Sequence, residues 1–153
     1  MAQARAFTPP SGGDPQLAAL KLPPHSIEAE QSLLGGLLLD NSAWDRIADQ
    51  VSEADFYRDD HRRIFRHIAR LIEAVRPADV VTVYESLEKS AEAEQAGGMA
   101  YLGEIANNTP SAANIKRYAE IVRERAILRK LVTVGDEIAA SALNPAGREA
   151  KAL

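Results

Sequence analysis

Apolar residues recur at helical spacing along most of this chain. The most regular run lies between Asp59 and Val75, where one face of the expected helix is apolar and the other carries four arginines. Pro77 ends this run, because a proline disfavours helical geometry in the residue before it. The pattern predicts a long amphipathic helix in the middle of the chain. Its apolar residues are Ile64, Phe65, Ile68, Leu71, Ile72 and Val75, and its arginines are Arg62, Arg63, Arg66 and Arg70.

Another helix is predicted to begin at Ile27, after two prolines that favour an extended entry. Ser26 is a good N-cap, and Glu28 and Glu30 place negative charge at the positive end of the helix. The pair Gly35–Gly36 lies inside this helix, where each glycine costs about 1 kcal/mol relative to alanine. We interpret the pair as a place where another helix packs closely, with an irregular helix end as the alternative.

Shorter helices are predicted on both sides of the central one. Turn formers at 40–42 precede an apolar pattern that includes Trp44, Ile47 and Val51. We interpret Trp44 as a core residue rather than a ligand contact, because a single tryptophan on such a stripe is usually buried.

Residues 79–82 contain β-branched side chains that could suggest a strand. Thr82 and Glu85, however, have the spacing of a capping box, which favours a helix. Two glycines at 97 and 98 then break the chain, and a further short helix is expected before the turn at 107–110.

From about Ser111 to Leu143 no proline interrupts the helical pattern. A single helix of this length would be roughly 45 Å long, more than the preceding helices could cover. Its apolar positions spread over more than one side, with Ile121, Ile127 and Val134 outside the narrowest stripe. A helix that is apolar on several sides is usually buried on several sides, so we expect a partner helix or a second subunit.

We therefore expect an all-α fold in four segments. Residues 1–22, rich in Ala, Pro and Gly, form a disordered tail, and residues 23–110 form a compact multi-helix head. Residues 111–143 form a long helix, the first arm of a helical hairpin. Residues 144–153 form a turn and the start of the second hairpin helix, which the end of the chain truncates.

Composition and charge narrow the range of functions. A net charge of −4 and a pI near 5.4 disfavour strong direct DNA binding by this domain, because nucleic-acid binders usually carry a basic surface. The absence of cysteine excludes disulfides and thiolate metal sites. No stretch approaches the ~20 apolar residues that span a bilayer, and no signal peptide is evident. We expect a cytoplasmic protein without membrane contact.

No motif predicts a catalytic, cofactor or metal site. A P-loop needs a glycine followed by lysine, and no Gly-Lys pair occurs. The best candidate is the group of Asp55, Asp59, Asp60, His61 and His67. The two histidines lie about 240° apart on a helix, unlike an i, i+4 metal pair, so we interpret the group as a solvated helix start. The arginine row could contact phosphate, but we interpret it as a solvated helix face that nearby acidic residues partly neutralise.

Several motifs occur in a characteristic order: PPHSIEAEQSLLGGL at 23–37, DFYR at 55–58, HRRIF at 61–65, DVVTV at 79–83, a Gly-Gly pair followed by Tyr101-Leu102, and matches from Asn114 to Leu131. Together they cover residues 22–143. In this order the motifs resemble the N-terminal domain of bacterial replicative DNA helicases of the DnaB family.

The resemblance implies a helical head and hairpin, with protomers that pair through the hairpins and three pairs that form the collar of a hexameric ring. It also implies docking of the primase C-terminal domain and, in some bacteria, of a helicase loader. The family's motor domain, which uses ATP and Mg²⁺, would follow, so we expect a truncated chain without enzymatic activity or a cofactor of its own.

By motif, the resemblance assigns contacts with primase or loader to Glu28, Tyr101, Val132 and Ile138. It assigns self-association to Tyr118, Ile121, Val122 and Leu128. Each assignment has a structural alternative: a first-turn carboxylate for Glu28, a half-buried core aromatic for Tyr101 and internal core for the aliphatic residues. Two other functions are possible for such a sequence, a stand-alone helical adaptor and, less consistent with the missing motifs, a small helical hydrolase.

Overall fold

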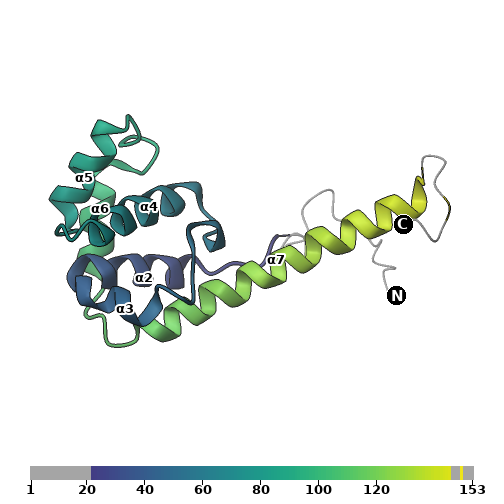
Figure 1. Cartoon of the computed structure of the whole chain (residues 1–153), viewed down its shortest axis with the longest axis horizontal. Helices are drawn as coiled ribbons and strands as arrows, with labels where there is room; N and C mark the ends of the chain where they lie inside the picture. Colours follow the sequence, from purple (N-terminus) through teal and green to yellow (C-terminus); the bar gives the residue numbers. More distant parts are fainter. Residues whose placement is uncertain (1–21, 146–148, 150–153) are drawn as a thin grey trace, which may run out of the picture.

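The computed structural model describes residues 22–145 and Glu149, and the described residues contain helices and no strand. Figure 1 shows a cluster of short helices, the head, from which one long helix extends far to one side. The all-α prediction with a long final helix is thus confirmed. In chain order the elements are α2 (Ile27–Leu39), η1 (Asn41–Ala43), α3 (Trp44–Ile47), η2 (Glu53–Asp55), α4 (Asp59–Glu73), α5 (Val80–Lys89), α6 (Gly98–Asn108) and α7 (Ile115–Leu143).

Helix α2 lies at the centre of the head and packs against α4, α6 and α7. It begins as predicted, because the Ser26 hydroxyl accepts a hydrogen bond from the backbone N–H of Ala29 at 3.2 Å. A Cβ on Gly35 would lie 2.0 Å from Thr109 Oγ1 and 2.8 Å from the backbone oxygen of Ile105. The interpretation of the glycine pair as a close-packing site is therefore confirmed.

The segment after α2 is less regular than its apolar pattern predicts. A 3₁₀ turn leads into α3, which ends at Ile47, and Val51 is buried beyond the end of the helix. Trp44 packs against the core and lies 5.5 Å from Phe65 between ring centroids. The tryptophan is thus a core contact, as predicted.

Helix α4 begins at the expected Asp59 and ends two residues before the expected Val75. The β-branched segment at 79–82 leads into a helix, α5, as predicted, but the predicted capping residue was wrong. Asp79 is the N-cap. Its carboxylate accepts a hydrogen bond from the backbone N–H of Thr82, and the Thr82 hydroxyl accepts one from the backbone N–H of Asp79. The helix therefore begins about one turn before the Thr82 cap that the sequence suggested.

Helix α7 lies against the head only along its first half. The buried residues of this 29-residue helix are Ile115, Ala119 and Val122, and residues 130–140 are all exposed. We call residues 130–143 the arm. Asn144 and Pro145 are not helical, and the expected second hairpin helix falls mainly on residues outside the described part of the chain. None of the described helices combines the length and apolar character needed to cross a membrane.

Candidate protein-interaction site

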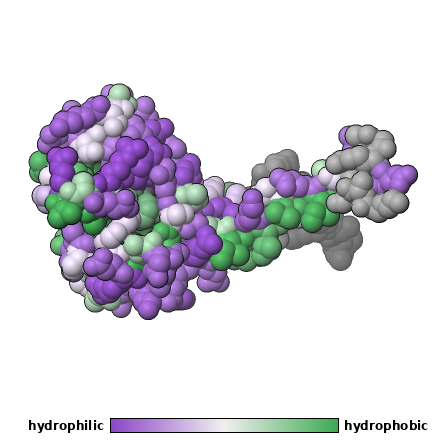
Figure 2. All heavy atoms as spheres, in the orientation of Figure 1, coloured by the Kyte–Doolittle hydropathy of each residue, from purple (hydrophilic) through white to green (hydrophobic). Residues whose placement is uncertain are grey.

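The exposed side of α7 carries a row of large apolar side chains, which we call the arm face. Leu131 is 62% exposed, Val132 50% and Ile138 65%. Figure 2 shows apolar residues gathered along one edge of the extended helix, with hydrophilic residues mainly along the other. Six residues make up the arm face: Ile127, Leu128, Leu131, Val132, Val134 and Ile138.

Helix geometry places the arm face on the side of α7 away from the head. At about 100° per residue, positions 127, 131, 134 and 138 fall within roughly 60° of one another. Leu128 and Val132 widen the face to roughly 160°, centred opposite the three residues that α7 buries in the head. This is broader than the narrow seam of a two-helix coiled coil, so the arm face can contact more than one element.

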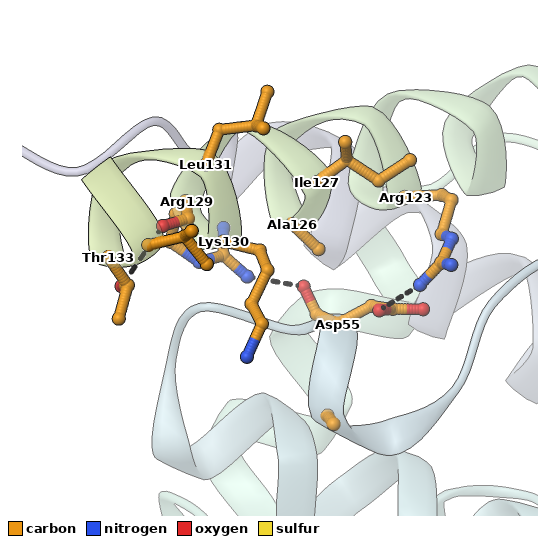
Figure 3. Close-up of a pocket in the computed structure, with 10 residues that line it drawn as sticks. Asp55, Arg123, Ala126, Ile127, Arg129, Lys130, Leu131 and Thr133 are labelled. Carbon is orange, nitrogen blue, oxygen red and sulfur yellow. Dashed lines mark hydrogen bonds and ion pairs between the residues drawn. The ribbon is translucent and has the colours of Figure 1, made fainter. Parts of the chain in front are cut away.

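A shallow groove runs between α7 and the η2 turn, lined by Ala54, Asp55, Arg123 and the following turns of the helix. Figure 3 shows Ile127 and Leu131 pointing away from Asp55, whereas Arg123 and Arg129 reach toward it. The polar contacts with the head therefore lie within this groove, and the arm face begins at its edge, since Ile127, Leu131 and Val134 also line it.

The four residues assigned to primase or loader contact lie in different environments. Glu28 is exposed in the first turn of α2, and Val132 and Ile138 belong to the arm face. Tyr101 is half-buried, and its hydroxyl lies 3.0 Å from Gln31 Nε2 and 2.6 Å from His61 Nε2. Burial raises the pKa of Tyr101, so the protonated hydroxyl can donate to the histidine. Its polar group is therefore engaged within the head.

The residues assigned to self-association are only partly accessible. Leu128 is exposed and belongs to the arm face, whereas Tyr118 and Ile121 are half-buried against the core. Val122 is 1% exposed and lies in the core of the head. Its assignment to a subunit contact is corrected, because this side chain is already covered by the chain's own head.

Sequence reasoning identified the arm face only in part: Ile127 and Val134 indicated a partner helix and Ile138 was a site candidate, but the four residues were not recognised as one row. Leu131 was not selected, although its spacing to Ile127, Val134 and Ile138 is four, three and seven residues. That spacing is the signal that could have identified it. The longer pattern of α7 concealed it, because apolar positions facing the head and those facing away were read together.

The interpretation of the aspartates and histidines as a solvated helix start holds for Asp59, which is exposed in the first turn of α4, but is wrong for the two histidines. His61 and His67 are both fully buried. His61 Nδ1 lies 2.7 Å from Glu30 Oε1, and His67 lies 2.7 Å from both Ser86 Oγ and Glu92 Oε2. Each imidazole therefore joins one carboxylate to one hydroxyl group. The described residues hold no group of acidic and histidine side chains arranged to bind a metal ion.

The arginine row of α4 is also more engaged than a solvated face would be. Arg62 donates to two backbone oxygens, and Arg63 and Arg66 both contact Glu92 Oε1, at 2.6 and 2.9 Å. The hydrogen bond from His67, together with the charges of His67 and Arg66, lowers the pKa of Glu92. Nearby acidic residues therefore neutralise the row, as predicted, but only Arg70 of the four is exposed and the other three are half-buried, so the row is less solvated than expected.

Residues 22–124 match the family model described as the DnaB-like helicase N-terminal domain. The chain is 45% identical over 140 residues to the replicative DNA helicase DnaB of Haemophilus influenzae, covering 92% of this chain and 30% of that protein. The chain thus spans about a third of the length of this curated relative.

Two solved structures show the same fold. The N-terminal domain of DnaB helicase from Mycobacterium tuberculosis has a TM-score of 0.79 and 37% identity, over 84% of this chain and 88% of that one. The N-terminal domain of DnaB helicase from Helicobacter pylori, described with its interactions with primase, has a TM-score of 0.65 and 24% identity. That similarity covers 74% of this chain and 89% of the other.

Proposed function

Because the chain belongs to the DnaB-like helicase N-terminal domain family, we propose that it serves as the collar and docking module of a replicative DNA helicase. In this role the arm face mediates assembly of the helicase ring. Protomers pair through their hairpins into dimers, and three dimers form a hexamer. No step of ATP hydrolysis is assigned to these residues. ATP and Mg²⁺ act elsewhere in the assembled helicase.

The arm face is the observation that carries the assembly proposal. Six large aliphatic side chains lie exposed on one side of a helix that has left its own head. Burying such a side chain contributes about 1.5–3 kcal/mol, so leaving several in water makes association favourable. The available width of roughly 160° accommodates both a second hairpin helix and a neighbouring subunit.

Sedimentation velocity over a range of concentrations tests the assembly proposal. We expect the chain to sediment faster as its concentration rises, and the double variant Leu131→Gln, Ile138→Gln to remain monomeric. The matched control is Val75→Gln, Val81→Gln, which changes two aliphatic side chains of the head that are 93% and 63% exposed. Association that survives in the arm variant, or is lost equally in the control, contradicts the proposal.

Docking of the primase C-terminal domain is the second part of the proposal, with a helicase loader as a further partner. Support comes from the shared fold of the Helicobacter pylori domain and its described interactions with primase. Val132 and Ile138 are accessible in the single chain, where primase would compete with assembly for them, and Glu28 offers a charge on the head. Tyr101 is half-buried, and its hydroxyl is engaged within the head, so any contact with primase would use the remaining accessible part of this side chain.

Titration calorimetry with the isolated primase C-terminal domain tests the docking. We expect Val132→Ala and Glu28→Gln each to weaken binding several-fold, and Val81→Ala to leave it unchanged. Tyr101→Ala complements them, provided its thermal unfolding confirms a folded head. Equal affinity of all variants removes these residues from the primase site.

We further propose a cytoplasmic location at the replisome, with DNA contacted mainly by other parts of the helicase. The negative net charge supports a role for this domain that does not include strong DNA binding. A stand-alone helical adaptor is the alternative function. The arm face favours the collar over the adaptor, because its width suits a symmetric assembly of several helices.

A further inference from the structure

Helix α7 is held to the head by a buried segment and by polar contacts beyond it. Its first eight residues contain all three of its buried side chains, Ile115, Ala119 and Val122. At about 1.5 Å per residue, this support spans roughly 11 Å of a helix about 43 Å long. Such a short support leaves the remaining length free to pivot unless a second one exists.

Two arginines extend the attachment beyond the buried segment: Arg123 directly follows Val122, and Arg129 lies nearly two turns further along the helix. Arg123 Nη1 lies 2.9 Å from Asp55 Oδ1, and the Arg129 guanidinium donates to the backbone oxygens of Asp55 and Pro24 at 2.6 and 2.9 Å. Arg129 also lies over the Tyr57 ring, 5.5 Å from its centroid. Figure 3 shows Arg123 and Arg129 reaching to Asp55. We call these contacts the latch.

The latch holds a segment whose own position depends on Glu30. The carboxylate of Glu30 accepts the backbone N–H of Tyr57 at 2.7 Å and that of Arg58 at 3.4 Å. Glu30 is 1% exposed, and a carboxylate buried this deeply requires such partners. Any change in the orientation of Glu30 therefore moves residues 57–58, and with them the latch.

Glu30 is in turn held by His61 and, through it, by Tyr101 on α6. A carboxylate oxygen only accepts, so we assign the proton of the imidazole to Nδ1, which donates to Glu30. Nε2 then accepts the Tyr101 hydroxyl proton, and Gln31 Nε2 donates to the same hydroxyl. Every polar atom in this chain of three side chains has a consistent role. We call Glu30, His61 and Tyr101 the relay.

We propose that the latch sets the direction of α7 and that the relay couples this direction to the environment of Tyr101. A contact that disturbs the Tyr101 hydroxyl loosens His61 and Glu30, then the 57–58 backbone, and finally the second support of the long helix. The coupling is intramolecular and operates whether or not the chain binds another protein.

Distance measurements between two spin labels test the coupling. Because the chain has no cysteine, Gln95→Cys on the head and Ala140→Cys on the arm give one defined pair. Both positions are exposed, and dilution with unlabelled chain removes contributions between molecules. Position 140 lies roughly 27 Å beyond Val122, where the first support ends, so a 20° swing of the helix moves the label by about 9 Å.

Arg129→Gln is expected to broaden the distance distribution most, and Tyr101→Phe, which removes only the hydroxyl, to broaden it by a smaller but measurable amount. The matched control is Ser86→Ala, which removes the hydroxyl from the other buried imidazole, His67. Its path to the latch is longer than that of Tyr101, because it runs through Glu92, Arg66 and then Glu53 of η2. Thermal unfolding of each variant separates loss of stability from loss of direction.

Three results would overturn the proposal. An unchanged distribution in Arg129→Gln removes the latch, and an unchanged distribution in Tyr101→Phe removes the relay. Equal broadening in Ser86→Ala shows general loosening of the head rather than coupling. Measured at a concentration at which the chain is monomeric, each readout is independent of self-association and primase binding, so a failed collar proposal leaves the coupling testable.

Discussion

In the head, Leu33, Leu34 and Leu37 of α2 are entirely buried, whereas Leu131 and Ile138 of α7 remain more than 60% exposed. The two regions are built from similar aliphatic residues on similar helices. Their difference is in what covers those residues: the head supplies its own neighbours, and the arm reaches beyond every other described element.

The contrast implies two sources of stability. Each buried leucine of the head contributes about 2 kcal/mol within a single chain, independent of concentration. The arm face obtains the same contribution only when another helix covers it, so its stability follows mass action. Substitutions in the head should therefore change folding, and substitutions on the arm should change association or local helix content.

Gly35→Ala is expected to have the largest effect on the head. The new Cβ would meet Thr109 Oγ1 at 2.0 Å and a backbone oxygen of α6 at 2.8 Å, so α2 and α6 must separate. We expect a loss of roughly 3 kcal/mol in the free energy of unfolding, at the upper end of typical overpacking. Urea denaturation followed by circular dichroism measures it. A loss below about 0.5 kcal/mol would show that the helices are not in close contact.

Glu92→Gln is expected to have the next largest effect, because Glu92 joins His67, Arg63 and Arg66. Hydrogen bonds to charged groups contribute about 1.5–3 kcal/mol, and we expect a loss of roughly 2 kcal/mol at neutral pH. The control is Glu85→Gln, whose exposed i, i+4 pair with Lys89 should contribute less than about 0.5 kcal/mol.

Glu92→Gln should also remove part of the pH dependence of the free energy of unfolding. The folded-state pKa of Glu92 is lowered, so its stabilisation is fully present above the ordinary value of about 4.3 and is lost as the pH falls through the lowered pKa. The denaturant midpoints of the unchanged chain and of Glu92→Gln, measured between pH 3 and 7, should therefore converge towards pH 3. A difference that stays constant over this range would mean that the charge of Glu92 is not involved.

The sequence predicted the helices of both regions, because each helix has a local apolar period or cap. It failed where the deciding contact is distant in sequence. His61 and His67 were read as solvated, since their partners Tyr101 and Glu92 lie 40 and 25 residues away. The arm face was only partly identified for a related reason. Periodicity shows which residues lie on the same side of α7. It does not show at which residue the head stops covering the helix.

Val75→Gly is a smaller test, at the edge of the head. Val75 is 93% exposed and has a φ of 57°, a left-handed conformation that a β-branched residue rarely adopts. Glycine relieves this strain, and we expect a gain of about 1 kcal/mol in the free energy of unfolding. Val81→Gly, at an exposed helical position, is the control and should destabilise the head by a similar amount. Loss of stability in both variants would mean that Val75 makes a contact worth more than its backbone strain.

Gly135→Ala on α7 repeats the first substitution in the other region and should have the opposite sign. A Cβ at Gly135 meets nothing within 4 Å, so alanine adds only helix propensity, roughly 0.5 to 1 kcal/mol. Because the arm makes few contacts with the head, the gain should appear as slower hydrogen exchange of amides in residues 130–143 rather than as a shift in unfolding of the head. The measurement belongs at a concentration where the chain is monomeric, since a partner helix packed closely on Gly135 would reject the new methyl group. Two results would together locate the covered side of the arm. In dilute solution Gly135→Ala should show stronger amide protection than the unchanged chain, and at high concentration it should associate more weakly.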